Sequence, residues 1–291
     1  MHPGMSATAS RPCTKQCVTG QLVAGRPNTV REGTFEVRQL QPKGGVYLPL
    51  DRESLSVQYE RDVDDPRVAH SVVLELDAYG TPLRSASVVY PRRGSPTYTE
   101  QAQLHVTLSE SEVVHLDIDD DVLRLAVPVE ARSYELHGLT PPASSIAPFT
   151  FAALLDAADA ADEAVEIAFT ATPTGTGTEE KRLLSRSRTR YLADDLSAPL
   201  AYGVVESKAL AYDSEAIAMT DAQRDAVFGS LTGAPTNTEL TTAGGYVLAD
   251  DAWWVRSGHP TYDPSRRSFA ERERHRTIGV SVFAQRPLSP T

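Results

Sequence analysis

Hydrophobic residues recur at every second position along most of this chain, which is the spacing of β-strands that bury one face. From Thr34 to Leu40 apolar and polar residues alternate, and the pattern ends at the turn-forming run 42–45. Further strands are predicted in the same way over residues 54–60, 69–76, 83–90, 102–108, 122–127, 128–136, 164–170 and 180–192. Residues 1–33 are rich in Gly, Pro, Thr and Ser and show no periodicity, so we expect a loose lead-in there.

The turn between the strands at 69–76 and 83–90 has a clear sequence signal. It runs from Asp77 to Pro82, and Asp and Pro both favour turns. We expect Gly80 in this turn to adopt a positive φ, which glycine tolerates without steric cost. Short turns between successive strands are typical of an antiparallel meander.

Two stretches show helical spacing instead. The first helix is expected over 150–163, with Thr150 as its N-cap. Its contacts with the sheet are expected at Phe151, Leu154 and Leu155. A shorter helix is expected over 220–231, ended by Gly233. The predicted fold class is mainly β, a large antiparallel sheet with two short helices.

Residues 180–192 differ from the other strands because both faces are polar. One face is expected to carry Arg186, Arg188 and Arg190, and the other Ser185, Ser187 and Thr189. Such a strand cannot lie against a dry core on either side. It is either a solvated edge strand blunted by charge, or part of a sheet with water on both sides, as in the wall of a hollow shell. A phosphate-binding surface is a minor alternative in so acidic a chain.

The composition limits the classes of partner. The chain has 291 residues, with 28 Lys and Arg against 39 Asp and Glu and a formal net charge of −11. General nucleic-acid binders neutralise phosphates with clustered positive charge, so we expect no nucleic acid partner. The sequence has no run of about 18 apolar residues, and its first 20 residues contain no apolar run of signal-peptide type. We therefore expect no direct membrane insertion.

The common catalytic and metal-binding motifs are missing from the sequence. It contains no nucleophile elbow, dinucleotide-binding glycine motif, P-loop or HExxH zinc motif. Cys13 and Cys17 lack a second cysteine pair, and the seven histidines are not at ligand spacing. The acidic run 117–121 lacks the spacing of a calcium loop and is interpreted as a solvated turn. We predict no catalytic, cofactor-binding or metal-binding residue, and no cofactor.

Two pairs of neighbouring residues near the C-terminus have a structural and a functional interpretation. Gly244 and Gly245 favour a tight turn into a strand over a phosphate-binding loop. Trp253 and Trp254 would face opposite ways on a strand, so at most one of them could stack on a given sugar ring. Core anchoring is the favoured interpretation of both indoles.

Several strings in a fixed order resemble one protein family. Residues 53–93 read ESLSVQYERDVDDPRVAHSVVLELDAYGTPLRSASVVYPRR, preceded by FEVRQLQP at 35–42. They are followed by EARSYELHGL at 130–139, KRLLSRSRTRYLADDLSAPL at 181–200 and GGYVLADDAWWVRSG at 244–258. Together these strings are similar to the middle/C-terminal region of the B component of Tc (toxin complex) insecticidal toxins. The resemblance covers roughly residues 30–262.

The resemblance implies a structural and non-enzymatic role. In Tc toxins the B and C components build a hollow β-shell from Tyr-Asp (RHS) repeats. The shell holds an unfolded toxic C-terminal enzyme, and a propeller on the B component docks it to the A-component channel. Residues 76–83 resemble a degenerate repeat unit with Asp77 and Gly80 in its hairpin turn.

The same resemblance implies the partners and the location of the chain. The partners are the remainder of the B component, the C component and, through them, the A-component channel, and the complex is secreted. We expect a lead-in at 1–33, one β-rich toxin domain at 34–262 and a basic tail at 263–291 that the family pattern does not reach. No propeller, tandem repeat run or self-cleavage core is visible, so we expect the chain to be a segment of a larger shell.

Two other functions compete with the shell segment. The first is a secreted β-rich carbohydrate-active or carbohydrate-binding protein that uses unspecified carboxylates and Trp253 or Trp254. A cleft with two carboxyls about 5–9 Å apart would favour it. The second is a β-sandwich interaction module, which two packed apolar sheet faces would favour. A broad antiparallel sheet with one open polar face would favour the shell segment.

Overall fold

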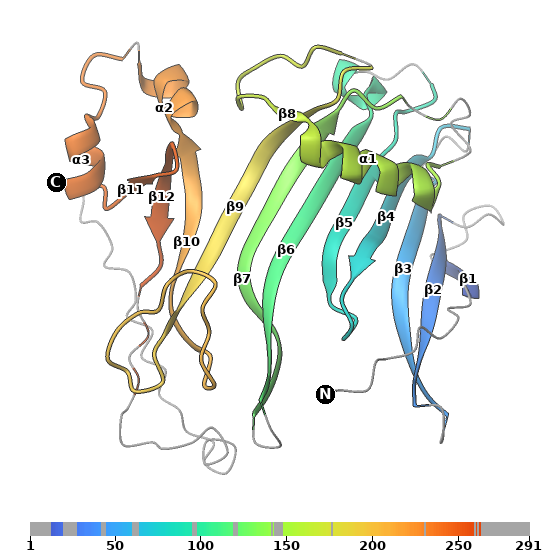
Figure 1. Cartoon of the computed structure of the whole chain (residues 1–291). Coiled ribbons are helices and arrows are strands. Elements are labelled where there is room, and N and C mark those ends of the chain that lie inside the picture. Colours follow the sequence, from blue (N-terminus) through green and yellow to red (C-terminus); the bar gives the residue numbers. More distant parts are fainter. Residues whose placement is uncertain are drawn as a thin grey trace. The chain divides into compact units, whose positions relative to one another are not determined.

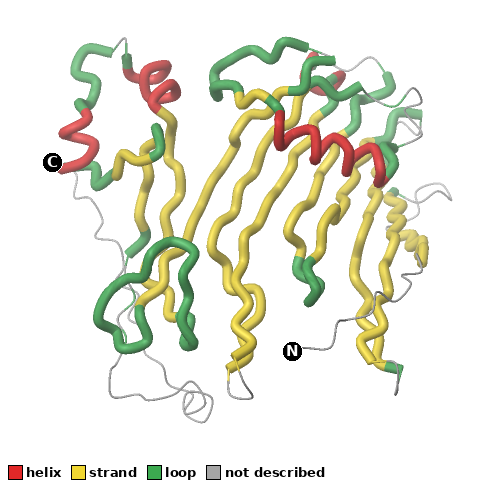
Figure 2. The backbone as a smooth tube through the Cα atoms, viewed as in Figure 1, coloured by secondary structure: helices red, strands yellow, loops and turns green. Residues whose placement is uncertain are grey.

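The protein, described here as a computed structural model, is dominated by strands, as Figure 2 shows. The structure describes residues 13–19, 28–41, 45–59, 64–94, 98–118, 122–140, 142, 148–175, 177–229, 231–258, 260 and 262. Its strands are β1 (Cys13–Thr19), β2 (Thr29–Gln41), β3 (Val46–Gln58), β4 (Arg67–Leu76), β5 (Pro82–Val89), β6 (His105–Ile118), β7 (Val122–His137), β8 (Val165–Glu166), β9 (Glu180–Leu192), β10 (Leu210–Thr220), β11 (Val247–Ala249) and β12 (Ala252–Arg256) (Figure 1). Its α-helices are α1 (Phe151–Glu163), α2 (Asp221–Phe228) and α3 (Asn237–Thr242), and Thr99–Ala102 form a 3-10 helix.

The strands form one large sheet, as the alternating pattern predicts. Their order is β1-β2-β3-β4-β5-β6-β7-β9-β10-β12-β11, and β8 pairs with β9 outside this path. The paired strands from β1 to β6 and from β9 to β12 run antiparallel, while β8 runs parallel to β9. Consecutive strands at the start of the chain are neighbours in the sheet, which confirms the predicted meander.

Several element boundaries differ from those predicted. The two strands expected at 122–127 and 128–136 are the single strand β7, whose alternation shifts where Ala126 adopts a φ of 55°. The strand expected at 164–170 shortens to the two residues of β8, because a turn follows at 168–171. The predicted elements did not include β10, β12 or α3.

The N-terminal expectation also needs correction. We expected no regular element before Thr34, but β1 lies at Cys13–Thr19 and β2 already begins at Thr29. The two strands pair over their whole common length, from Cys13 opposite Phe35 to Thr19 opposite Thr29. Residues 1–12 and 20–27 of the expected lead-in, and the expected basic tail 263–291, lie outside the described residues.

The chain divides into two compact units, which are described separately. The first contains Met1–Glu110, Tyr134–Ile167 and Pro173–Arg182, and the second contains Ser111–Ser133, Ala168–Thr172 and Leu183–Thr291. The division into a lead-in, a toxin domain at 34–262 and a tail stays a prediction.

In the first unit, α1 covers one face of the sheet (Figure 1). The buried apolar side chains alternate along the strands, as they must when one face is dry. They include Val72, Leu74, Ala86, Val88, Val106 and Leu108 of β4 to β6, and Leu154, Ala158 and Ala161 of α1. Leu154 therefore packs as predicted. Phe151 and Leu155 are only half-buried, and the small residues Ala158 and Ala161 face the core in their place.

The turn between β4 and β5 is confirmed. The Asp77 carboxylate accepts hydrogen bonds from the backbone N–H groups of Tyr79 and Thr81, both at 2.8 Å. Gly80 has a φ of 87°, and a Cβ there would lie 2.7 Å from a Leu50 methyl group. The positive φ favours glycine at this position, and a side chain there would also have to displace the Leu50 methyl group.

In the second unit, the helix expected at 220–231 is α2. The side chain of Thr220 accepts a hydrogen bond from the Gln223 N–H, and the Gln223 side chain in turn accepts one from the Thr220 N–H. This capping box fixes the start of the helix, which is a local and readable signal. The helix ends at Phe228 with Gly229 as its C-cap, earlier than the predicted stop at Gly233.

Candidate functional site

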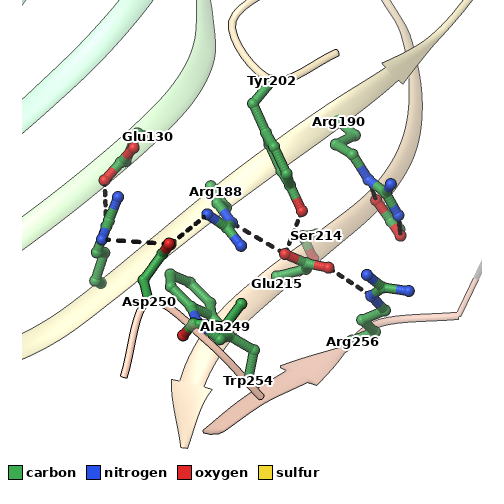
Figure 3. A network of polar contacts seen from close by, with 12 residues as sticks. Glu130, Arg188, Arg190, Tyr202, Ser214, Glu215, Ala249, Asp250, Trp254 and Arg256 are labelled. Atoms are coloured by element: carbon green, nitrogen blue, oxygen red, sulfur yellow. Dashed lines mark hydrogen bonds and ion pairs between the residues drawn. The ribbon is translucent and has the colours of Figure 1, made fainter. Parts of the chain in front are cut away.

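The polar strand β9 is the most unusual feature of the second unit. Its arginines form a set with the acidic and aromatic side chains around them, which we call the arginine cluster: Arg186, Arg188, Arg190, Glu130, Asp213, Glu215, Asp250, Arg256, Tyr202 and Trp254 (Figure 3). β9 lies between β7 and β10 in the sheet, so its interpretation as a solvated edge strand is wrong.

Cross-strand register places opposite charges side by side on three strands. Glu215 of β10 lies opposite Arg188 of β9 and opposite Arg256 of β12. Arg188 Nε is 3.0 Å from Glu215 Oε2, and Arg256 Nε is 2.5 Å from Glu215 Oε1. The Tyr202 hydroxyl, from the loop after β9, donates to the same carboxylate (Figure 3). Directly opposed residues are the closest neighbours on a sheet face, so the register itself builds this row.

The other two arginines of β9 have their own acidic partners. Arg190 binds Asp213 through two parallel bonds, Nε to Oδ1 at 2.9 Å and Nη2 to Oδ2 at 2.5 Å. Arg186 Nε donates to Glu130 Oε1 of β7 at 2.5 Å. Asp250 lies 3.1 Å from Arg188 Nη1 and 4.0 Å from Arg186 Nη1, and so bridges two of the arginines. The charges of the cluster are satisfied within the cluster.

Aromatic rings enclose the central guanidinium. The Arg188 guanidinium lies 4.0 Å from the centre of the Trp254 ring system and 4.2 Å from that of Tyr202. Its side chain retains only 13% of its exposure, although arginine is among the most polar residues. Planar, weakly hydrated guanidinium groups stack well on aromatic faces, which explains how a charged side chain is covered here.

The two faces of β9 are therefore unlike. Ser185 and Ser187 are exposed, whereas the arginine face is largely covered by carboxylates and rings. The expectation of water on both sides is met at Ser185 and Ser187 but not further along the same face, where Tyr191 is buried, and the arginine face is a packed polar layer. The sequence pattern showed the polarity of this face but not the partners that cover it.

The arginines control the ionisation of the cluster. Burial acts to raise the pKa of Glu215, but hydrogen bonds from Tyr202, Arg256 and Arg188 outweigh it and lower that pKa. The pKa of Glu130 is lowered in the same way, since bonds from Arg186 and Arg132 outweigh its burial. Carboxylates held in the ionised form are poor proton donors, which disfavours Glu130 and Glu215 as the general acid of a glycosidase.

Burial of both tryptophans supports their role as core anchors. Trp253 and Trp254 are fully buried. The indole N–H of Trp253 donates to Asp221 of α2 at 2.8 Å, and that of Trp254 donates to the Ala249 carbonyl at 2.9 Å. Neither ring has a free face for a sugar.

Gly244 and Gly245 form a turn, as predicted. They end α3, where the N–H of Gly244 binds the Glu239 carbonyl and that of Tyr246 binds the Leu240 carbonyl. Both bonds satisfy carbonyls at the helix terminus, so the N–H groups are not arranged around an anion.

Other predicted features are only partly described. The backbone of Cys13 and Cys17 lies in β1. Asp117 lies near the end of β6, and 119–121 lie outside the described residues. Within the described ranges, no three His, Cys, Asp or Glu side chains are grouped closely enough to hold a metal ion.

Most of the acidic and aromatic members of the arginine cluster were not predicted from the sequence. Tyr202 and Asp250 lie in connections between strands, where periodicity gives no signal. Along β10, Asp213 and Glu215 share one face of the strand and the residues between them share the other. This alternation over 212–217 is a strand signal that the sequence contains.

Comparison with known proteins gives a family match for the first part of the sheet. Residues 20–127 match the family model described as "Insecticide toxin TcdB middle/C-terminal region". These residues are therefore similar to the TcdB toxin middle/C-terminal region. The matched residues include the block at 59–93, on which the resemblance to Tc toxin B components mainly rests. That resemblance is thereby confirmed.

A solved structure shares the fold of the chain over a wider range of residues. It is that of the Photorhabdus luminescens Tc holotoxin pore, with a TM-score of 0.59 and 22% sequence identity, over 81% of this chain. The chain spans 11% of the length of the matched one. A search of curated proteins gave no match. In the described ranges, no helix has the length and apolar character needed to cross a membrane.

Proposed function

We propose that this chain is a non-enzymatic structural segment of a Tc-type toxin B component. It would form part of the β-shell that encloses a toxic C-terminal enzyme and helps to deliver it. The family match of residues 20–127 carries this proposal. The fold shared with a chain of a Tc holotoxin supports it over a wider part of the sequence.

The geometry of the sheet supports a scaffold role. A wall segment needs strands whose polar faces are stable without a second sheet packed on them. The arginine cluster satisfies its own charges, and the Asp77–Gly80 turn joins two antiparallel strands, which is compatible with a degenerate Tyr-Asp repeat. We extend the toxin domain over 34–262 on the same grounds.

The proposed partners follow from the proposed role. They are the remainder of the B component, the C component and, through them, the A-component channel, in a secreted complex. No nucleic acid or membrane partner is part of the proposal. The carbohydrate-active alternative is less well supported, because both tryptophans are buried and arginines lower the pKa values of Glu130 and Glu215.

Co-expression tests the proposal. The chain is produced alone, with the remainder of a B component, and with both that remainder and a C component. Alone it is expected to self-associate through its sheet edges, whereas the three together should elute as one stable, closed complex.

The control is the same B-component remainder expressed without this chain, which should fail to enclose the C component. A monodisperse monomer that hydrolyses a glycoside or ester well above background would contradict the proposal, as would a closed complex that forms equally well without the chain.

A further inference from the structure

Strand β7 contains a strained residue in the hairpin that it forms with β6 (Figure 1). Ala126 has a φ of 55°, in the left-handed region that non-glycine residues seldom enter. In antiparallel strands this conformation is typical of one class of β-bulge, in which the position is normally a glycine. For alanine it is unfavourable, because Cβ approaches the following carbonyl oxygen. Such strain persists only where the surrounding structure maintains it.

The neighbouring strand supplies one group that maintains the strain. The Ala126 N–H donates to Nδ1 of His115 on β6 at 3.1 Å. A backbone N–H only donates, so this ring nitrogen is the acceptor. A half-buried backbone N–H without a partner is costly, and a bulge turns such a group away from the regular ladder. His115 therefore takes the place of a backbone carbonyl.

The burial pattern of β7 inverts at the same residue. Before Ala126, the side chains of Leu123 and Leu125 are exposed, to 65% and 44%. After it, Val127 and Val129 are buried. In a regular strand these four odd-numbered side chains would lie on one face. The left-handed residue accounts for the inversion, which leaves two leucines in solvent.

The side chain between the two leucines makes a contact on the opposite face. Arg124 Nε donates to the Ser207 carbonyl at 2.7 Å. Ser207 lies in the loop 193–209, where its hydroxyl donates to Asp194 Oδ2 at 2.5 Å. A regular alternation would turn Arg124 to the other face, away from this carbonyl. The exposure of the leucines is thus coupled to the attachment of β7 to that loop.

We propose that His115 is a positioning residue that holds Ala126 in its left-handed conformation and thereby sets which side chains of β7 face solvent. With His115 in place, Leu123 and Leu125 are turned outward. Without its ring nitrogen the segment before Ala126 should return to regular alternation, which turns both leucines inward. The proposal does not depend on the toxin role of the chain.

Amide hydrogen exchange in the full chain tests the role of the ring nitrogen. In His115→Leu the Ala126 N–H loses its acceptor, so its protection factor should fall about tenfold. In His115→Asn the side-chain oxygen can accept the same hydrogen bond, so the protection should be retained. His105→Leu, at a half-exposed histidine of the same strand, is the matched control and should leave the Ala126 amide unchanged.

Hydroxyl-radical footprinting of the same variants tests the alternation. Oxidation of Leu123 and Leu125 should fall in His115→Leu and stay at the wild-type level in His115→Asn. The exposed Leu184 of β9 is the internal reference. Two further variants change the backbone preference and leave the histidine in place. Ala126→Val should lower the oxidation of both leucines, because a β-branched residue resists a positive φ, whereas Ala126→Gly should retain it.

Unchanged oxidation of the leucines in His115→Leu would overturn the proposal, as would equal losses of Ala126 protection in His115→Leu and His115→Asn. If His115→Leu does not fold, the two variants of Ala126 decide. Equal oxidation of Leu123 in Ala126→Val and Ala126→Gly would then contradict the proposal.

Discussion

At the residue scale, Glu215 is the central carboxylate of the arginine cluster. Its side chain is 1% exposed, and it binds two arginines and a tyrosine hydroxyl. A buried charge pair adds little net stability, because desolvation opposes attraction, but removal of one partner leaves the other uncompensated. The arginine cluster is therefore expected to depend strongly on this carboxylate.

Replacement of Glu215 by Gln tests that dependence. Glu215→Gln keeps the shape of the side chain but leaves Arg188 and Arg256 without its charge, and should lower the free energy of unfolding by about 3 kcal/mol. Asp250→Asn is the matched control, since Asp250 is 54% exposed and should contribute less than about 1 kcal/mol. Urea unfolding measures both. Equal losses in the two variants would show that burial does not set the strength of the cluster.

Gly80 provides a second prediction at this scale. Gly80→Ala should cost about 1–2 kcal/mol, because a left-handed conformation is strained for alanine and the new methyl group displaces Leu50. Gly203→Ala has the same sign of φ, 81°, in open space, so it isolates the backbone part of the cost. An unchanged denaturation midpoint for Gly80→Ala would mean that the turn tolerates a side chain.

At the element scale, α1 begins directly after Thr150, the N-cap that the sequence predicts. The Thr150 hydroxyl accepts a hydrogen bond from the Ala153 N–H at 3.2 Å, which satisfies one of the free donors at the helix start. Thr150→Ala should therefore lower the free energy of unfolding by about 1 kcal/mol. Thr150→Ser keeps the oxygen and should retain most of the stability, and an equal loss in both variants would exclude capping as the cause.

The elements that the sequence predicted and those that it missed differ in their physical basis. The turn at Asp77–Gly80 and the caps Thr150 and Thr220 are local devices, so a few residues suffice to recognise them. The position of β9 inside the sheet depends on which distant strands pair with it. An isolated polar alternation is compatible with an edge or an interior strand, and tertiary pairing decides.

The arginine cluster also combines a local feature that the sequence predicts with tertiary contacts that it does not predict. Three arginines on one face of β9 were readable from alternation, and so was their shared orientation. Their neutralisation by Asp213 and Glu215 required the register of β10, and their coverage by Tyr202 required the path of a loop. Side-chain partners that come from connections carry no periodic signal in the sequence.

At the scale of the whole molecule, acid should destabilise both units. The pKa of His137 in the first unit is lowered chiefly by burial, so its stabilisation is present above its unfolded value of about 6.5 and is lost as pH falls through the folded value. The pKa values of Glu130 and Glu215 in the second unit are also lowered, and their contribution is lost below about 4.5.

Urea unfolding at a series of pH values tests this order. Stability should fall first near the histidine range and then more steeply below about pH 4.5. Glu215→Gln should show a shallower second fall, because one of the titrating groups is gone. A free energy of unfolding that rises on acidification would contradict the assigned directions.

The attachment of α1 has a mechanical consequence. The helix is fastened to strands that are not neighbours: Arg52 of β3 stacks on Phe151, Arg84 of β5 binds Asp159, and Lys181 of β9 donates to the Ala161 carbonyl. In a bare sheet an end strand can be peeled away, because each hydrogen-bonded pair opens separately. A helix tied across the strands acts as a crossbar that spreads a pulling load over several of them. The first unit is expected to yield to force as one block, without strand-by-strand unzipping.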